Sequence, residues 1–415
     1  MNILEDSKEI IGDMLINKKT YDKALSSFLV TNIRNNKELD EIHKAYVTFF
    51  NHYFYYEFLT KELLSKLTPN LIAFMGVAFM GVRFFKISID ESEDFLKNAL
   101  KNNKEDYSKD IEKALNDYMI GKDYEFKSFL VGSISHLSVF FNLPSWFISM
   151  VIGQQNKDIG KTVFESFKTN YSNLYIENNL ANHDDIDKNE LNVFVPYGTF
   201  FKTKNKESEL IKNHTFINSE LLYGKVFENK LNANNKYVTL YQGCKSNFYF
   251  NFLNEYLFKN NVINIAMKTF EDNPDVINEV ILKKKNDLFV CESTVGELIA
   301  RLSYKQDILF YMPKSTDMQR FFYCPEYRVN FDQKSIDELI VTQEKGIKEV
   351  SNYVADNGKL IYVAETIDKK ETTNIVHSFL ENNQDYILEK EEMFLPTKNI
   401  KSFGYYAILK RHNHA

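Results

Sequence analysis

The chain of 415 residues is 44% hydrophobic and 26% charged, as is typical of globular proteins, and its length predicts two or three domains. Its formal net charge of −6 argues against a protein that holds nucleic acid mainly through phosphate contacts, although the total leaves room for a local basic face. Cys244, Cys291 and Cys324 lack any CxxC or Cys/His spacing, so the sequence predicts neither a disulfide framework nor a metal site.

The first part of the chain shows no sign of a targeting or membrane segment. Residues 1–14 are acidic and lack the apolar core and basic flank of a secretory signal. The longest apolar run, residues 71–82, is shorter than the roughly 20 residues that a membrane helix needs. We therefore expect a cytoplasmic protein without a membrane partner, in which this run is a buried helix.

Residues 1–137 are predicted to form an all-α bundle. Apolar residues recur there at three- and four-residue spacing, with almost no proline. A helix that begins near Asp40 carries one apolar stripe. Residues 70–85 form a helix that is apolar on nearly all sides, which suits the centre of a bundle.

Residues 138–232 are predicted to form a small α+β middle subdomain. It opens with Leu143-Pro144-Ser145-Trp146, followed by an apolar helical run that stops at Gly153. Short β-like stretches such as residues 191–195 follow, separated by polar, Asn-rich connections.

Residues 233–411 alternate short apolar strands with helices, the pattern of a parallel sheet with helices on both faces. The predicted strands are residues 237–241, 262–266, 288–291, 308–312, 359–363 and 405–409. The predicted helices are residues 248–258, 275–284, 295–303, 335–355 and 372–381. The fourth helix is expected to stop at Asn357-Gly358 and to run directly into a strand.

A series of motifs in the second half of the chain resembles one family. The motifs are Met312-Pro313-Lys314-Ser315, Cys324-Pro325-Glu326-Tyr327-Arg328, Gln343 and Asn357-Gly358-Lys359-Leu360-Ile361-Tyr362, with Leu143-Pro144-Ser145-Trp146 upstream and Glu371, Phe379-Leu380, Leu395-Pro396 and Gly404-Tyr405-Tyr406 downstream. In this order the chain resembles a degenerate member of the bacterial 16S ribosomal-RNA cytosine-C5 methyltransferases of the Sun/Fmu type. The resemblance implies three parts: a NusB-like helical domain over residues 1–137, the middle subdomain, and a Rossmann-like class I methyltransferase domain over residues 233–411.

The chemistry of that family depends on a cysteine thiolate. C5 of cytosine is not nucleophilic, so these enzymes attack C6 with a thiolate before C5 takes a methyl group from S-adenosylmethionine. The resemblance puts Glu365 at the nucleophile position, and Lys314 at the position of a second cysteine that assists release of the base. No cysteine follows Cys324, so no shift of register restores the nucleophile.

Two further interpretations concern these positions. Lys314 and Glu365 are predicted to face a common pocket and to form an ion pair there; the alternative is that both are solvated and point apart. Cys324 could serve as a relocated nucleophile, but a catalytic thiol needs an activating base, and an incidental loop cysteine is the favoured interpretation.

The cofactor loop also departs from the family pattern. That loop is rich in glycine because glycine lets the backbone approach a cofactor closely. Residues 239–248 keep only Gly243, and Lys245 and Ser246 replace a glycine pair. S-adenosylmethionine is therefore the cofactor that the resemblance implies, while the side chains of this loop predict that its binding is lost.

Two acidic positions of the family are changed as well. Met267 stands where the resemblance places a carboxylate for the ribose hydroxyls, with Glu271 four residues later. Tyr311 replaces the aspartate before the Pro-Cys motif. Several independent functional positions have therefore changed together.

Three hypotheses remain open from the sequence. The first is a catalytically inactive methyltransferase homologue that binds RNA, either ribosomal RNA or a ribosomal subunit, and not DNA. The second is an active S-adenosylmethionine-dependent RNA methyltransferase with a divergent site. The third is a ribosome-assembly or transcription factor that acts through the NusB-like bundle.

Overall fold

The computed structural model describes residues 2–127, 129–168, 174–177, 192–194, 200–202, 216–219, 237–243, 263–267, 288–292, 294–302, 304–322, 324–329, 331, 333–396 and 404–412. The chain divides into two compact units. The helical unit comprises Met1–Gly153 together with Cys324–Asn330, and the sheet unit comprises Gln154–Tyr323 and Phe331–Ala415. A short segment from the second half of the chain therefore belongs to the first unit.

The N-terminal part of the chain is helical, as predicted. Its helices are α1 (Ile3–Asn17), α2 (Tyr21–Leu29), α3 (Asn36–Phe50), α4 (Tyr53–Leu63), α5 (Pro69–Phe84), α6 (Ile89–Asn102), α7 (Lys109–Met119), α8 (Ile134–Phe141) and α9 (Ser145–Gln154). Local sequence signals set their starts: Asn35 and Glu38 form a capping box at α3, and Pro69 occupies the first turn of α5 behind the capping Thr68.

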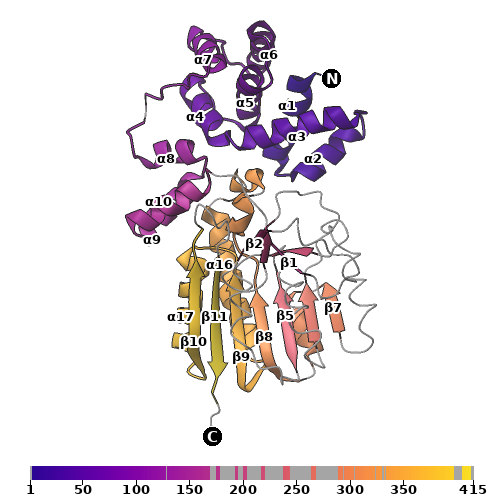
Figure 1. Ribbon diagram of the computed structural model, residues 1–415, viewed down its shortest axis with the longest axis vertical. Helices are drawn as coiled ribbons and strands as arrows, with labels where there is room; N and C mark the ends of the chain where they lie inside the picture. The colour runs from indigo at the N-terminus through magenta and orange to yellow at the C-terminus, as the bar shows by residue number, and fades with distance from the viewer. Residues whose placement is uncertain are drawn as a thin grey trace. The chain divides into compact units, whose positions relative to one another are not determined.

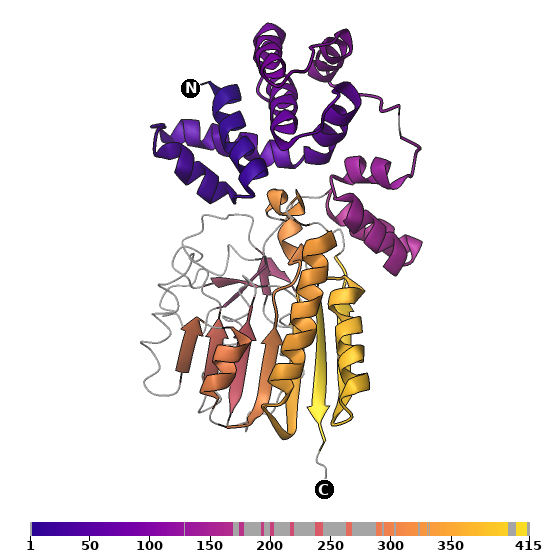
Figure 2. The ribbon, with the colours of Figure 1, turned by 180° about the vertical axis from the view of Figure 1, so that it is seen from behind.

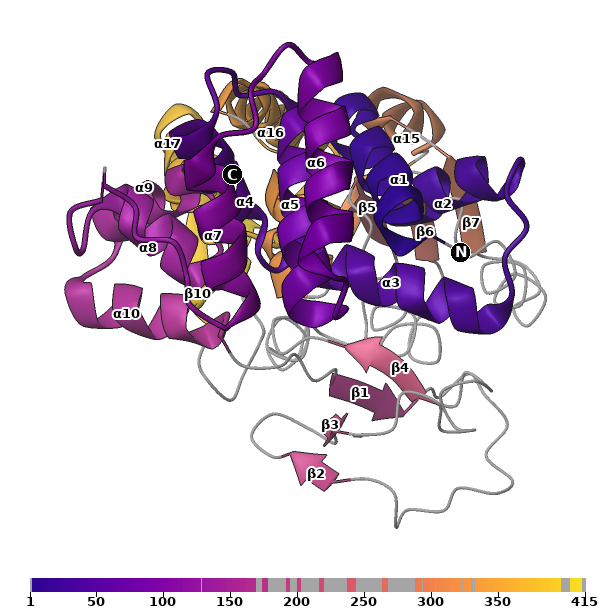
Figure 3. The same ribbon diagram turned by 90° about the horizontal axis from the view of Figure 1, so that it is seen from above.

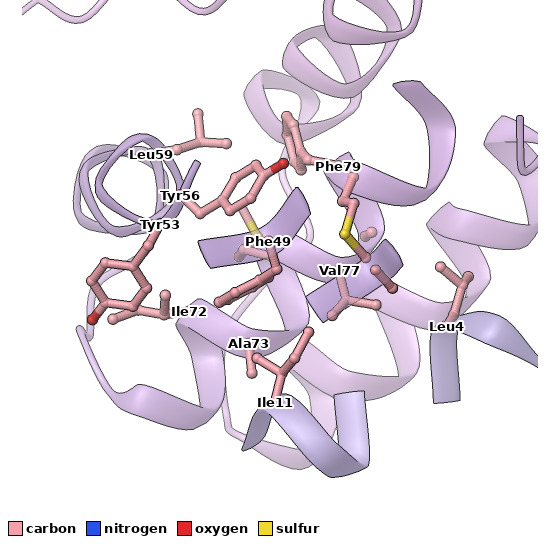
Figure 4. Packing of buried hydrophobic residues seen from close by; sticks show 14 of the residues in the cluster. Leu4, Ile11, Phe49, Tyr53, Tyr56, Leu59, Ile72, Ala73, Val77 and Phe79 are labelled. Carbon is pink, nitrogen blue, oxygen red and sulfur yellow. The ribbon is translucent and has the colours of Figure 1, made fainter. Parts of the chain in front are cut away.

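The core of the helical unit is built around α5, which contacts α1, α3, α4, α6 and α7 (Figure 3). Large aromatic and aliphatic side chains from these helices fill the space around Val77 (Figure 4). The predicted buried helix over residues 71–82 is thus confirmed, because eleven residues of α5 are buried. No single helix within the described ranges is long and apolar enough to cross a membrane, although α8 and α9, which meet at a bend of 112°, reach that length and composition as a pair.

The sheet unit contains a seven-stranded sheet (Figure 1). Its strands are β5 (Val238–Gln242), β6 (Ile263–Met267), β7 (Leu288–Glu292), β8 (Gln306–Met312), β9 (Val354–Ala364), β10 (Tyr386–Phe394) and β11 (Gly404–Arg411). They lie in the order β10-β11-β9-β8-β5-β6-β7. The strands from β9 to β7 pair in parallel, whereas β11 is antiparallel to both β9 and β10.

Helices α15 (Val295–Arg301), α16 (Gln333–Ser351) and α17 (Thr373–Asn382) belong to this unit, and α16 and α17 lie across the same face of the sheet (Figure 2). Between β8 and α16 the chain forms two short 3-10 helices, η2 (Met318–Phe322) and η3 (Pro325–Val329), and η4 (Lys369–Glu371) precedes α17. The predicted parallel pairing is confirmed from β9 to β7, whereas the predicted strand 405–409 is antiparallel, so the sheet is mixed. Helices on both faces stay a prediction.

A second, smaller sheet lies in the predicted middle region. After α10 (Lys157–Ser166), the strands β1 (Leu174–Glu177), β2 (Asn192–Phe194), β3 (Phe200–Lys202) and β4 (Phe216–Ser219) form an antiparallel sheet in the order β2-β3-β1-β4. β2 falls within the stretch predicted as residues 191–195. The boundaries at residues 137 and 232 stay predictions.

Two predictions about elements were wrong. The fourth helix does not stop at Asn357-Gly358; α16 ends at Ser351, and both residues lie within β9. There Asn357 has a positive φ of 60°, and the pairing with β8 jumps from Gln306–Val354 to Ile308–Lys359, so the Asn-Gly pair forms a bulge. β10 was not predicted at all. The predicted helices 248–258 and 275–284 lie outside the described residues.

Candidate functional site

The candidate site lies at the carboxyl ends of the parallel strands. β5 pairs with β6 on one side and with β8 on the other, so the strand order reverses between β5 and β8. Open α/β sheets bind ligands beyond the carboxyl ends of the strands at such a reversal. We call the chain that follows β5, β8 and β9 at these ends the carboxyl edge.

The predicted site positions that the structure describes lie at the carboxyl ends of β5, β6, β8 and β9. Gly243 directly follows β5 and its N–H donates to the carbonyl oxygen of Met312 at 2.7 Å. Met267 is the last residue of β6, Lys314 comes two residues after β8, and Glu365 directly follows β9. Lys245, Ser246 and Glu271 lie outside the described residues.

Lys314 and Glu365 differ in their surroundings. Lys314 is exposed, whereas only 1% of the Glu365 surface is exposed. Of the ion pairs between described residues, none joins these two side chains, so the predicted Lys314–Glu365 pair is not formed. A cation in water and a buried carboxylate replace the two positions that the resemblance gives to cysteines.

The space around Gly243 is filled by the chain itself. A Cβ atom at this position would lie 2.9 Å from the backbone nitrogen of Lys314 and 3.3 Å from atoms of the Tyr241 ring. This glycine is therefore required by the close approach of Lys314, and its backbone presents no open surface on that side. Of the predicted cofactor loop, residues 244–248 lie outside the described residues, and no step is derived through S-adenosylmethionine.

Tyr311 is part of a row of aromatic rings across the sheet. Its ring stacks on Tyr241 with centroids 5.5 Å apart, and Tyr362 on β9 lies 6.0 Å away on the other side. The Tyr311 hydroxyl also packs against Gly346 of α16, where a Cβ atom would come within 1.9 Å of it. Where the resemblance expects a carboxylate facing a ligand, Tyr311 is a core residue with 1% exposure.

Glu371 is the centre of a buried polar cluster that joins the connections after β8 and β9. Its Oε1 accepts from the Thr316 backbone N–H and from Gln343 Nε2, both at 3.0 Å. Its Oε2 accepts from the Thr316 hydroxyl at 2.7 Å and from the Thr366 hydroxyl at 3.3 Å. Gln343 Nε2 also donates to the carbonyl oxygen of Lys314 at 3.0 Å, so this cluster fixes the backbone that carries Lys314.

The protonation of Glu371 is set by its burial. Burial raises the pKa of Glu371 from 4.5 to about 7, while the hydrogen bonds from Thr316 and Gln343 act in the opposite direction. The sequence signalled Glu371 and Gln343 only as parts of a resemblance. Neither residue type reveals from sequence alone that it will be fully buried.

In the described connections after β8 and β9, the exposed charges at the carboxyl edge are positive. Lys314, Lys369 and Lys370 are exposed. The acidic residues that the structure describes in the connections after β8 and β9 are buried; they are Asp317, Glu326, Glu365, Asp368 and Glu371. A surface of this kind attracts anions such as phosphate groups. The described residues contain no group of His, Cys, Asp and Glu side chains that could hold a metal ion.

Comparisons with known proteins support the fold. Neither a protein-family model nor a curated protein sequence matches the chain. Among solved structures, the chain is similar to PH0851, with a TM-score of 0.72 and 15% identity over 98% of this chain and 99% of the other. It is also similar to a methyltransferase homologue from Pyrococcus horikoshii, with a TM-score of 0.53 and 11% identity over 68% of this chain and all of the other. The chain therefore has a Rossmann-like methyltransferase fold preceded by a helical region.

Proposed function

We propose that this protein is a member of the ribosomal-RNA cytosine-C5 methyltransferase family that has lost methyl transfer and binds RNA through its carboxyl edge. One observation carries the proposal: exposed Lys314 and buried Glu365 stand at the two positions where the resemblance expects cysteines. Neither an ammonium nor a carboxylate replaces a thiolate as the nucleophile that adds to C6 of cytosine. The NusB-like identity of the helical unit and a cytoplasmic location belong to the same proposal.

We propose that Cys324 does not serve as a substitute nucleophile. It is the last cysteine in the chain, and it lies outside the motif position that the resemblance gives to the nucleophile, which is Glu365. A nucleophile must be positioned against its base and substrate. We therefore retain the interpretation of Cys324 as a residue without a catalytic role.

Loss of the cofactor is tested by calorimetric titration with S-adenosylmethionine and its demethylated product. The close approach of the Lys314 backbone and the Tyr241 ring to Gly243 leads us to expect no binding up to millimolar ligand. Saturable micromolar binding would favour the second hypothesis, an active methyltransferase with unusual contacts, and would call for a screen of RNA substrates.

RNA binding is tested by replacing Lys314, Lys369 and Lys370 together with alanine. Binding of a ribosomal-RNA fragment should weaken, and the dependence of log K on log salt concentration should become shallower by about 0.7–0.9 for each phosphate contact that is lost. A matched control replaces three other exposed lysines of the sheet unit, Lys305, Lys345 and Lys348, with alanine. Equal losses in the two triple variants would show that only net charge matters and would remove the carboxyl edge as the binding surface.

Total charge does not separate the third hypothesis, a factor that acts through the helical unit alone, from the first. Residues 1–135 carry 18 lysines and arginines against 21 aspartates and glutamates. Proteins that hold RNA through phosphates usually carry a basic excess on the binding domain. The other residues, 136–415, carry 33 lysines and arginines against 36 aspartates and glutamates, the same net charge of −3. The exposed lysines of the carboxyl edge, and not the total charge, therefore make the sheet unit the proposed partner of ribosomal RNA or a ribosomal subunit.

A further inference from the structure

The connection between β8 and α16 leaves the sheet unit and returns to it. Its middle part, Cys324–Asn330, belongs to the helical unit, while the residues before and after it belong to the sheet unit. We call residues 317–342 the strap and Cys324–Asn330 its tip. Separate sets of contacts hold the tip within the helical unit and the ends of the strap within the sheet unit.

The tip is held by buried polar groups as well as by apolar packing. Glu326 and Arg328 are each only 6% exposed. The Tyr46 hydroxyl of α3 donates to Glu326 Oε2 at 2.5 Å, and Tyr46 itself stacks on Tyr21 of α2 with ring centroids 4.1 Å apart. Val329 packs against the core of the helical unit. Losing one partner of a hydrogen bond in a buried site is costly, because the other partner is left unsatisfied.

Arg328 links the tip to a second junction of helices. Its Nη1 donates to the carbonyl oxygen of Asn142, which ends α8 in a left-handed conformation, at 3.1 Å. The Asn142 side chain then bridges the break between α3 and α4, donating to the Phe50 carbonyl at 2.8 Å and accepting from the Phe54 N–H at 3.2 Å. Arg328 therefore connects the tip to the end of α8, and Asn142 connects that end to α3 and α4.

The ends of the strap meet at Glu371. Thr316, immediately before the strap, donates both its N–H and its hydroxyl to this carboxyl group. Gln343, immediately after the strap, donates to the same carboxyl group from α16. The buried carboxyl group of Glu371 therefore accepts hydrogen bonds from residues at both ends of the strap. We call these hydrogen bonds the clasp.

From this arrangement we propose that the strap couples the stability of the helical unit to the packing of the carboxyl edge. A change that loosens the clasp at Glu371 frees the ends of the strap, and the tip then loses part of its anchorage in the helical unit. Because coupling between two sites is reciprocal, a change at the tip also loosens the clasp. This inference goes beyond RNA binding and does not depend on it.

The test is hydrogen–deuterium exchange of the full-length chain, read peptide by peptide. Thr316→Val removes the hydroxyl that donates to Glu371 and keeps nearly the same shape, and Thr342→Val is the matched control because Thr342 is exposed on α16. We expect Thr316→Val to raise exchange in α3 and α8 by about fivefold, the effect of losing one typical hydrogen bond. Thr316→Ser keeps a hydroxyl and should restore the wild-type rate.

The reciprocal experiment changes the tip. Glu326→Gln weakens the bond from Tyr46, and the exposed Glu338→Gln serves as its control. Exchange should rise both in α3 and in the residues around Glu371, and Tyr46→Phe combined with Glu326→Gln should cost less than the sum of the two. If exchange rises only in the unit that carries each substitution, the proposed coupling is wrong. The Glu326→Gln experiment decides this even if the Thr316→Val variant does not fold.

Discussion

Replacing Glu371 with glutamine should remove a pH dependence from the stability of the sheet unit. Burial raises the pKa of this carboxyl group from 4.5 to about 7, so below pH 4.5 it is neutral in both the folded and the unfolded chain. Between pH 4.5 and about 7 the unfolded chain has released the proton while the folded chain still holds it, so the free energy of unfolding falls over this range. At about 1.4 kcal/mol for each pKa unit, the loss reaches about 3 kcal/mol above pH 7.

Glutamine reproduces the neutral form of Glu371 without this penalty. Its carbonyl oxygen can accept from the Thr316 N–H and Gln343 Nε2, and its amide group can donate to the Thr316 hydroxyl. We therefore expect Glu371→Gln to match the wild type within about 1 kcal/mol at pH 5 and to be more stable by about 3 kcal/mol at pH 8.

The assay is urea unfolding at pH values from 5 to 8, with hydrogen exchange of β8 and β9 peptides identifying the transition of the sheet unit. The Glu338→Gln variant is the control, because it also replaces a glutamate with glutamine, but at an exposed position. Parallel pH profiles for Glu371→Gln and the wild type, or a less stable variant at pH 8, would refute the assignment of a buried neutral carboxyl group.

Three further substitutions test the packing of the sheet unit and the helical unit. Gly346→Ala should destabilise the chain by about 1–3 kcal/mol in thermal unfolding because its Cβ meets the Tyr311 hydroxyl, and Tyr311→Phe should recover part of that loss. Gly243→Ala should also destabilise, since its Cβ meets the Lys314 backbone nitrogen; an unchanged melting temperature would contradict this close approach. Arg328→Ala should lower the stability of the helical unit by about 1–3 kcal/mol, measured by exchange of α8, and an effect limited to the sheet unit would count against its placement.

Much of the sheet unit could be predicted from the sequence because its strands are short apolar runs bounded by polar turns. The predicted strands from 237–241 to 405–409 each overlap an observed strand. β10 escaped prediction because its sequence contains the charged run Glu389-Lys390-Glu391-Glu392. That composition suits its position at the edge of the sheet, where charged side chains discourage pairing with another chain.

An Asn-Gly pair such as residues 357–358 is compatible with either the end of a helix or a bulge within a strand. Asn and Gly both tolerate a positive φ, which serves a helix end as well as a bulge within a strand. The helix stops earlier because Val354 is already buried and paired with Gln306 in the sheet. Tertiary contacts therefore decided between two local structures that the sequence allows equally.

The candidate site was predicted in position but not in its interactions. Gly243, Lys314 and Glu365 follow consecutive strands of the sheet core, so the strand pattern placed them at one edge. Whether Lys314 would meet Glu365 depended on side-chain burial, which the sequence pattern does not give. The clasp at Glu371 and the tip at Glu326 join residues far apart in the chain, and periodicity carries no information on such contacts.

Loss of methyl transfer is the central claim, and one assay tests it most directly. Purified protein is incubated with S-adenosylmethionine carrying a radiolabelled methyl group and with unmodified transcripts of ribosomal RNA, alongside a Cys324→Ala variant. We predict no incorporation above background with either protein. Incorporation at C5 of cytosine that disappears in the Cys324→Ala variant would contradict the proposal, because it would identify a working nucleophile in this chain.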